Sequence, residues 1–378
     1  MRLLLLSSTN GGGHNACAEA IKQRFESNDC ECVCIDAMRL VSPSVSRIAS
    51  AVHVGVYRHA PHIFGAGYKY TEAHSRLSKG TPTYDLLVAA APKLAKMISD
   101  GEYDVVICTH VFAAIMLTEA VEKYGCRAFT AFVDTDYTCT PGTGSSKLDA
   151  YFIPSKSLVE AHVADGIPRE KITASGIPVR EMFYDSLPGA TAKALQGISP
   201  TGKHIVVMCG SMGAGPMQTL TRRIVRRLAD DDRMTIVCGT NRRLCRKLKL
   251  LFKANENVCV KGFVRNVSAL LDSADLYVTK PGGISTSEAA VKRLPMVLFN
   301  SVAGCETYNR DFYCALGAAK SAPNISQIAE LCASLLADDR QTEAMRNAYD
   351  AYEVLHGNAS EIIFNTVNSK VISRGEAV

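Results

Sequence analysis

Short apolar runs alternate with stretches of helical composition along most of the chain, and this alternation restricts the possible folds more than any other feature. The strand-like runs lie at residues 3–7, 32–35, 103–108, 129–133, 150–153, 204–209, 234–238, 258–260, 275–279 and 296–298. The helical patterns include residues 16–25, 83–99, 113–124, 157–164 and 217–228. Strands that alternate with helices form parallel sheets covered by helices. The expected fold class is therefore α/β with doubly wound parallel sheets.

The length of the chain indicates two domains. A single hydrophobic core stops growing at roughly 250–300 residues, and this chain has 378. The pattern of strands and helices lapses between 186 and 203, where glycine and proline residues cluster, and it restarts at His204. We therefore expect an N-terminal domain at 1–185, a linker at 186–203, a C-terminal domain at 204–358 and a last helix within 359–378.

The stretch 279–288 has the residue order of a phosphate site. A strand-like run ends at Thr279, a Pro-Gly-Gly turn follows, and helix-forming residues begin at Ser287. Free backbone N–H groups and the positive end of a helix dipole would then face an anion, and Glu288 could accept hydrogen bonds from ribose hydroxyls. An ordinary turn has the same residues. Glycine loops also follow the strand-like runs at 3–7 and 204–209.

The remaining composition favours a cytoplasmic protein. No run reaches the roughly 18 apolar residues of a spanning helix, and the N-terminal apolar run is too short for a signal peptide. Most of the 14 cysteines lie inside apolar runs, where cysteine acts as a small core residue. Such cysteines are typical of a protein in a reducing compartment, and their positions argue against a disulfide framework or a metal site.

Two segments have a basic composition. Residues 222–253 contain eleven Lys or Arg against three Asp, within a chain of net charge +5. Such a block is either a solvated helix face or a patch for anionic lipid or nucleic acid. Residues 42–80 mix aromatic, apolar and basic side chains with a single acid, Glu72. They suit either an interfacial membrane segment or a pair of partly buried helices.

Five segments, taken in chain order, resemble the diacylglycerol glycosyltransferases. These enzymes include the plant-type monogalactosyldiacylglycerol synthases and the bacterial processive diacylglycerol glucosyltransferases, which are relatives of the peptidoglycan lipid-linked N-acetylglucosaminyltransferase. The segments are 11–14 with 16–21, 175–180, 262–264, 279–288 and 304–309. The resemblance implies a glycosyltransferase-B fold, in which two Rossmann-like domains face a cleft. The N-terminal domain would bind the acceptor and the membrane, the C-terminal domain would bind a UDP-sugar, and a last helix at 360–373 would cross back to the N-terminal domain.

The same resemblance assigns residues to the UDP-sugar. The turn would hold the diphosphate, Glu288 the ribose, Phe263 and Val264 the uracil, and the segment up to Asn309 the sugar. The full set is Gly13, Gly210, Ser211, Met212, Gly213, Phe263, Val264, Gly282, Gly283, Ile284, Ser285, Glu288, Glu306 and Asn309. Cys305 stands where relatives usually have glutamine, and a thiol is a poorer hydrogen-bonding group than a carboxamide. Glucose and galactose therefore both stay open as the donor sugar.

The acidic run at 134–139 follows a strand-like run and supplies candidates for a general base. Asp136 aligns with the family's Thr-Asp segment and is the first candidate, with Asp134 second. His14 follows three glycines and would donate a hydrogen bond or share the base role. Asp134 and Asp136 could instead bind a divalent metal or cap a turn. We expect neither metal nor cofactor, because helix N-termini can stabilise a departing UDP.

These inferences describe an inverting transferase that moves glucose or galactose from a UDP-sugar to a diacylglycerol and gives a β-glycosyl lipid. Its expected partners are the UDP-sugar, diacylglycerol and an anionic membrane surface on the inner face of the cell membrane, without nucleic acid. The alternatives are the peptidoglycan branch of the family, a UDP-N-acetylglucosamine epimerase on the same architecture, and a non-catalytic protein that binds UDP-sugars.

Overall fold

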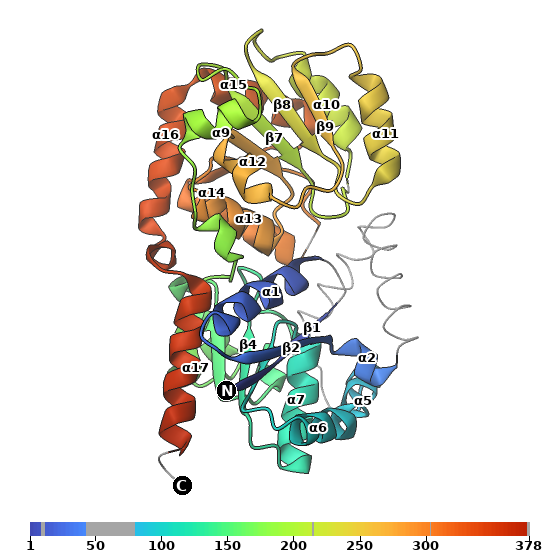
Figure 1. The fold of residues 1–378 in the computed structure, drawn as a ribbon, viewed down its shortest axis with the longest axis vertical. Coiled ribbons are helices and arrows are strands. Elements are labelled where there is room, and N and C mark those ends of the chain that lie inside the picture. The colour runs from blue at the N-terminus through green and yellow to red at the C-terminus, as the bar shows by residue number, and fades with distance from the viewer. Residues whose placement is uncertain (9–11, 43–79, 214, 303, 376–378) are drawn as a thin grey trace. The chain divides into compact units, whose positions relative to one another are not determined.

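The computed structural model describes residues 1–8, 12–42, 80–213, 215–302 and 304–375, which belong to two compact units (Figure 1). Unit 1 comprises Met1–Glu181, Val302–Cys305 and His356–Val378, and unit 2 comprises Met182–Ser301 and Glu306–Leu355. The basic aromatic segment predicted at 42–80 lies outside the described residues, apart from its two end residues.

Unit 1 contains one sheet of six parallel strands in the order β2-β1-β3-β4-β5-β6. The strands are β1 Arg2–Ser7, β2 Glu31–Asp36, β3 Val105–Cys108, β4 Phe129–Val133, β5 Ala150–Ile153 and β6 Ile172–Ala174. All four leucines at 3–6 in β1 are fully buried. Burial on both faces is expected for a central parallel strand that helices cover from both sides.

The helices of unit 1 include the last helix of the chain. The α-helices are α1 Gly12–Glu26, α2 Met38–Val41, α5 Pro82–Val88, α6 Ala91–Asp100, α7 Val111–Tyr124, α8 Val159–Ala164 and α17 Ala359–Gly375. Helix α17 packs against α1, where the rings of Phe25 and Phe364 meet edge to face with their centroids 5.1 Å apart. The helix predicted at 83–99 is two helices, because Pro92 suits the first turn of α6 and not a helix interior.

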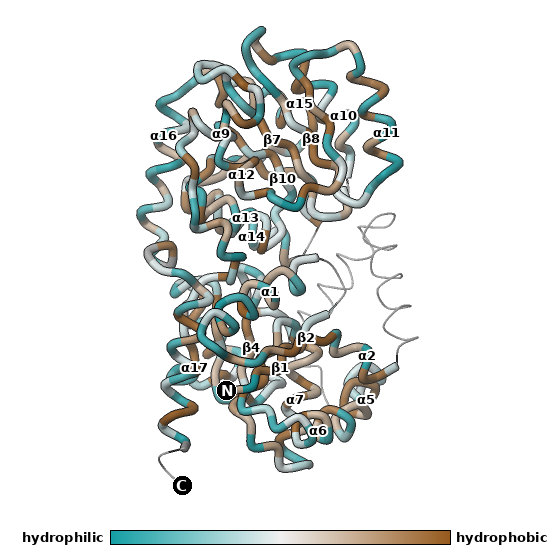
Figure 2. The backbone as a smooth tube through the Cα atoms, viewed as in Figure 1, coloured by the Kyte–Doolittle hydropathy of each residue, from teal (hydrophilic) through white to brown (hydrophobic). Residues whose placement is uncertain are grey.

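Unit 2 contains a second sheet of six parallel strands, in the order β12-β11-β10-β7-β8-β9. The strands are β7 His204–Met208, β8 Arg233–Val237, β9 Val258–Lys261, β10 Leu276–Thr279, β11 Met296–Leu298 and β12 Ala319–Ser321. The predicted fold class of two doubly wound parallel sheets is confirmed. Figure 2 shows that β7 and β8 are hydrophobic whereas α16, an outer helix, is largely hydrophilic.

The helices of unit 2 connect these strands. They are α9 Gly189–Leu195, α10 Met217–Val225, α11 Arg242–Leu251, α12 Val267–Asp272, α13 Gly283–Val291, α14 Cys305–Leu316, α15 Ile325–Ala337 and α16 Asp339–Asn347. None of the helices in the described ranges combines the length and the apolar composition of a bilayer-spanning helix.

The segment 186–203 differs from the expected linker, because it is part of unit 2 and contains α9, which packs on α12. The Lys193 ammonium lies 2.8 Å from the Asp275 carboxylate and donates to the Gly202 carbonyl oxygen at 2.9 Å. The carboxylate compensates the buried charge of the lysine, and the pair joins α9 to the start of β10.

His204, the first residue of β7, is fully buried among polar groups. Its Nδ1 lies 3.2 Å from the Ser273 carbonyl oxygen, and its Nε2 lies 2.8 Å from the Thr235 hydroxyl. A carbonyl oxygen only accepts, so Nδ1 carries the proton and Nε2 accepts from Thr235. Burial disfavours the charged imidazolium and lowers the pKa of His204 to about 4.

We predict that His204 makes the protein less stable as the pH falls from about 6.5 to about 4. The unfolded histidine binds a proton near pH 6.5, whereas the folded one stays neutral, so protons favour the unfolded state across this window. The loss amounts to about 3 kcal/mol at most. The free energy of unfolding, measured with urea at pH 7, 6, 5 and 4, should fall less steeply with pH for His204→Gln than for the wild type. Parallel declines would contradict the prediction.

Candidate active site

Each sheet has one place where the chain reverses its direction of winding. In unit 1, β1 lies between β2 and β3, and in unit 2, β7 lies between β8 and β10. Open α/β proteins bind ligands at the carboxyl edge of the sheet beside such a reversal, because the loops that follow the two diverging strands separate there. Gly13 and His14 follow β1, and the two glycine turns of unit 2 follow β7 and β10, whereas Asp136 and Phe263 follow other strands.

In unit 1, His14 in α1 lies against the loops that follow β3 and β4. Its Nδ1 is 2.7 Å from the Thr109 carbonyl oxygen and 3.1 Å from the Thr135 hydroxyl. The Thr109 hydroxyl donates to the backbone carbonyl of His14 at 3.2 Å, and the His110 ring packs edge-on against the His14 ring. Because the Thr109 carbonyl only accepts, Nδ1 carries the proton, and Nε2 is the ring atom that accepts a proton when the imidazole acts as a base.

Asp134 is buried and anchors the loop that follows β4. One carboxylate oxygen accepts from the Thr140 hydroxyl at 2.7 Å, and the other lies 3.3 Å from Nε2 of His162 in α8. Burial lowers the pKa of His162, but the hydrogen bond and the charge of Asp134 outweigh burial and raise it above the ordinary value. His162 was not predicted from the sequence, because nothing in α8 indicates its contact with a residue 28 positions earlier.

Asp136 lies two residues further along the same loop and is only half-buried. Its backbone N–H donates to Asp134 at 3.4 Å. The Asp134 carboxylate therefore holds the backbone that carries both Thr135, which contacts His14, and Asp136. The two predicted catalytic residues, His14 and Asp136, depend on one loop for their placement.

In unit 2, Lys280 directly follows β10. Its Nζ lies 2.6 Å from the Glu306 carboxylate, and its Cε would be 3.0 Å from a Cβ added at Gly210. Gly210 also has a φ of +63°, which L side chains rarely adopt. The side chain of Lys280 therefore runs over the glycine loop that follows β7, at the start of α13.

Lys280 was missing from the residues predicted to bind the donor, although the sequence contains a signal for it. A cation near the positive end of a helix is unfavourable unless an anion compensates it. Lys280 precedes the first residue of α13 by three positions, and Glu306 supplies a carboxylate. A lysine in a glycine turn that begins a helix is therefore a reason to look for a bound anion.

The turn before α13 is shaped by its own glycines and by Asn309. Gly282 is the N-cap residue and has no side chain to accept from the first N–H groups of the helix. The Asn309 amide is fully buried and donates to the Pro281 carbonyl oxygen at 3.0 Å. Gly283 and Glu288 are buried, and Ile284 and Ser285 are half-buried.

The other predicted donor residues fall into three places. In the loop 210–213, a Cβ at Gly213 would meet the Cys238 carbonyl oxygen, and the Ser211 carbonyl oxygen accepts from the backbone of Thr240. Met212 in this loop is half-buried, like Val264, whereas the neighbouring Phe263 is 64% exposed. Gly13 belongs to unit 1, in the first turn of α1. The structure thus gathers the turn, Glu306 and Asn309 around Lys280.

Two family models together span most of the chain. Residues 14–179 match the model for monogalactosyldiacylglycerol (MGDG) synthase, and residues 198–351 match the model for glycosyl transferases group 1.

Relatives that align over most of this chain are identical to it at about a quarter of the aligned positions. A processive diacylglycerol beta-glucosyltransferase from Bacillus subtilis is 25% identical over 372 residues, which cover 97% of this chain and 94% of that protein. The protein of the same name from Bacillus cytotoxicus is 25% identical and covers 92% of this chain and 88% of its own length.

Solved structures share the fold at low sequence identity. Acinetobacter baumannii MurG has a TM-score of 0.64 at 14% identity and covers 97% of this chain and 99% of its own. The UDP-GlcNAc 2-epimerase of Neisseria meningitidis, bound to UDP-GlcNAc, has a TM-score of 0.65 at 14% identity and covers 98% of this chain and 100% of its own. These likenesses identify the architecture as glycosyltransferase-B-like.

We predict that Asp134 contributes mainly to stability, in contrast to Asp136. Asp134→Asn removes the charge of a buried pair and leaves His162 without its counter-ion, which should cost about 3 kcal/mol of unfolding free energy. Asp136→Asn is the matched control in the same loop and should cost less than about 1 kcal/mol. Urea unfolding of the two variants checks this order, and equal losses would contradict it.

Proposed function

Because residues 14–179 belong to the MGDG synthase family and residues 198–351 to the group 1 glycosyl transferases, we propose that this glycosyltransferase moves glucose or galactose from a UDP-sugar to diacylglycerol. The observation that carries the proposal is the position of Lys280, beside the glycine-capped start of α13. A lysine together with free helix N–H groups suits a diphosphate.

The donor occupies unit 2 in this proposal. The diphosphate accepts hydrogen bonds from the first turn of α13 and lies near the Lys280 ammonium, which Glu306 positions. Glu288 binds the ribose, and Phe263 covers the uracil with its exposed ring. Glu306 and Asn309 are near the sugar. As the sugar leaves UDP, negative charge grows on the diphosphate, and the helix dipole and Lys280 stabilise it without rearranging.

The acceptor hydroxyl attacks the anomeric carbon from the side opposite UDP. A new carbon–oxygen bond forms while the bond to the diphosphate breaks, UDP keeps the electron pair, and the hydroxyl proton passes to a base. Asp136 and His14 are the proposed proton acceptors, and the tautomer fixed by Thr109 makes His14 Nε2 competent for that role. One displacement inverts the anomeric centre, so an α-linked donor yields a β-glycosyl lipid.

The proposed acceptor also determines where the enzyme works. Diacylglycerol stays in a bilayer, so the enzyme must lie on a membrane to reach its hydroxyl. We propose a peripheral enzyme on the inner face of the cell membrane, where UDP-sugars are available. The bacterial relatives are named for glucosyl transfer, and this favours UDP-glucose over UDP-galactose for the present chain.

We expect label from UDP-glucose or UDP-galactose to enter the lipid phase when each donor is incubated with the protein and diacylglycerol vesicles. Chromatography of the organic extract identifies the product and counts its sugars. Vesicles without diacylglycerol are the control. Absence of lipid-soluble label with both donors would contradict the proposed function.

We predict that Asp136→Asn and His14→Ala lower kcat while leaving UDP affinity within about twofold. Removal of a group that takes the acceptor proton lowers kcat by about 10²–10⁴. The larger loss identifies the base, and calorimetric titration with UDP measures donor binding. Asp100→Asn, at the exposed end of α6, is a matched control. Wild-type turnover in both active-site variants would rule out both assignments.

A further inference from the structure

The stretch 222–253 of unit 2 carries a positive charge that its own residues do not neutralise. It holds eleven Lys or Arg against three Asp. Among the described residues, only Arg227 of the eleven forms an ion pair, with Glu330 at 3.5 Å. We call its exposed part the basic face and define it by Arg222, Arg226, Arg243, Arg246 and Lys253.

The two helices of the basic face pack on the same side of the unit 2 sheet. Leu220 and Ile224 of α10 and Leu248 of α11 belong to one hydrophobic cluster over the strands. Because these apolar residues face inward, the basic residues on the opposite sides of both helices face solvent. Figure 1 shows α11 beside β9, the last strand at one edge of the sheet, and α10 packs against α15.

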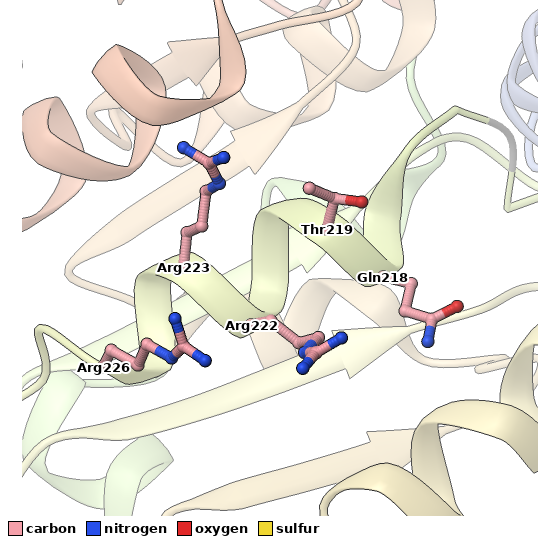
Figure 3. A pocket seen from close by; sticks show the side chains of 5 residues that line it. All are labelled: Gln218, Thr219, Arg222, Arg223 and Arg226. Atoms are coloured by element: carbon pink, nitrogen blue, oxygen red, sulfur yellow. The ribbon is translucent and has the colours of Figure 1, made fainter.

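The outer side of α10 carries a hollow of about 420 Å³ whose lining is rich in arginine. Gln218, Thr219, Arg222, Arg223 and Arg226 line it, and their side chains project from successive turns of the helix (Figure 3). The three guanidinium groups around this hollow repel one another. An anion in the hollow relieves that repulsion, so it binds there more favourably than beside an isolated arginine. Guanidinium, amide and hydroxyl donors together suit phosphate oxygens.

The outer side of α11 adds an apolar component. Leu250 is 77% exposed, and it lies on the side of the helix opposite the buried Leu248. Arg246 and Arg243 lie one and two turns before it, respectively, on the same side. Leu251 beside it is 36% exposed. Leucines among basic residues are typical of helices that insert a few side chains at the boundary between headgroups and acyl chains.

The alternative partner for such a charge, a nucleic acid, is less compatible with this surface. Proteins that bind single-stranded nucleic acids present aromatic rings on which bases stack. Phe252 is the one aromatic residue between 215 and 253, and it is buried. The exposed leucines would make no favourable contact with a charged phosphodiester backbone.

We propose that the basic face binds the surface of an anionic phospholipid bilayer, with lipid phosphates in the hollow of α10 and Leu250 at the acyl boundary. The inference deepens the proposed function, which requires a lipid acceptor, and it gives the unit that binds the donor its own contact with the membrane. Attraction to the anionic lipids then keeps the donor-binding unit at the surface that holds the acceptor.

The test is flotation of the full-length protein with vesicles of phosphatidylcholine alone or with 30% phosphatidylglycerol. Arg222→Gln/Arg226→Gln and Arg243→Gln/Arg246→Gln should each weaken binding to the anionic vesicles roughly tenfold or more. Arg340→Gln/Arg346→Gln removes the same charge from α16 and should change binding by less than about twofold. The losses should shrink as salt screens the charges.

A second comparison isolates the apolar contact. Leu250→Ser should weaken vesicle binding at high salt, where electrostatic attraction is screened. Leu195→Ser is the matched control, because Leu195 is 68% exposed on α9. Equal effects of the two substitutions would show that Leu250 makes no special contact with the bilayer and would overturn that part of the proposal.

The outcomes separate the inference from the proposed transferase activity. The arginine variants should glycosylate diacylglycerol in neutral detergent micelles at the wild-type rate. Inactivity of every form with both donors, together with arginine-dependent flotation, would refute the activity and support the surface. Unchanged flotation in both double variants would overturn the inference. Tighter binding of a single-stranded RNA oligonucleotide than of anionic vesicles at the same salt would overturn it too.

Discussion

Every strand in both sheets is parallel, and this constraint determines where chemistry can take place in each unit. Parallel strands end at the same edge, and the helices that follow them begin there, so free N–H groups and polar loops collect at that edge. In unit 1 the parallel arrangement places His14 of α1 against Thr109, which follows β3, and Thr135, which follows β4. In unit 2 it brings Lys280 after β10 over the glycine loop after β7.

Ion pairs fix the helix whose N-terminus the donor would use. At the front of α13, Lys280 pairs with Glu306, and the lysine side chain retains 19% of its exposure. At the rear, Lys292 pairs with Asp272 at 2.8 Å, and both side chains are almost completely buried. Breaking a buried pair leaves an uncompensated charge, so the rear pair holds the helix firmly. The front pair is accessible enough for a phosphate to approach the lysine.

The residues that form the strands could be read from the sequence, whereas contacts between distant segments could not. The buried runs at β4 and β5 are continuous and apolar, and their predicted bounds are those of the structure. The three-residue strands β6 (Ile-Thr-Ala) and β12 (Ala-Lys-Ser) went unpredicted, because they lack the continuous apolar run that identified the equally short β11. Lys280 and Glu306 are 26 positions apart, and His162 and Asp134 are 28 apart. Only the folded structure shows which carboxylate pairs with which basic side chain.

The two groups of cations in unit 2 differ in exposure, and exposure decides what each can do. Lys280 is largely enclosed, so solvent and salt screen its charge weakly, and its effect is confined to an anion in contact with it. Arg222, Arg226 and Arg243 are exposed, so each contributes little to a single contact. Their fields add up at an extended anionic surface within a Debye length of about 8–10 Å. A leaving group needs the first arrangement, and a bilayer of charged lipids needs the second. The low exposure of Lys280 and the high exposure of the basic face are therefore consistent with one enzyme that handles a small anion and a large one at separate places.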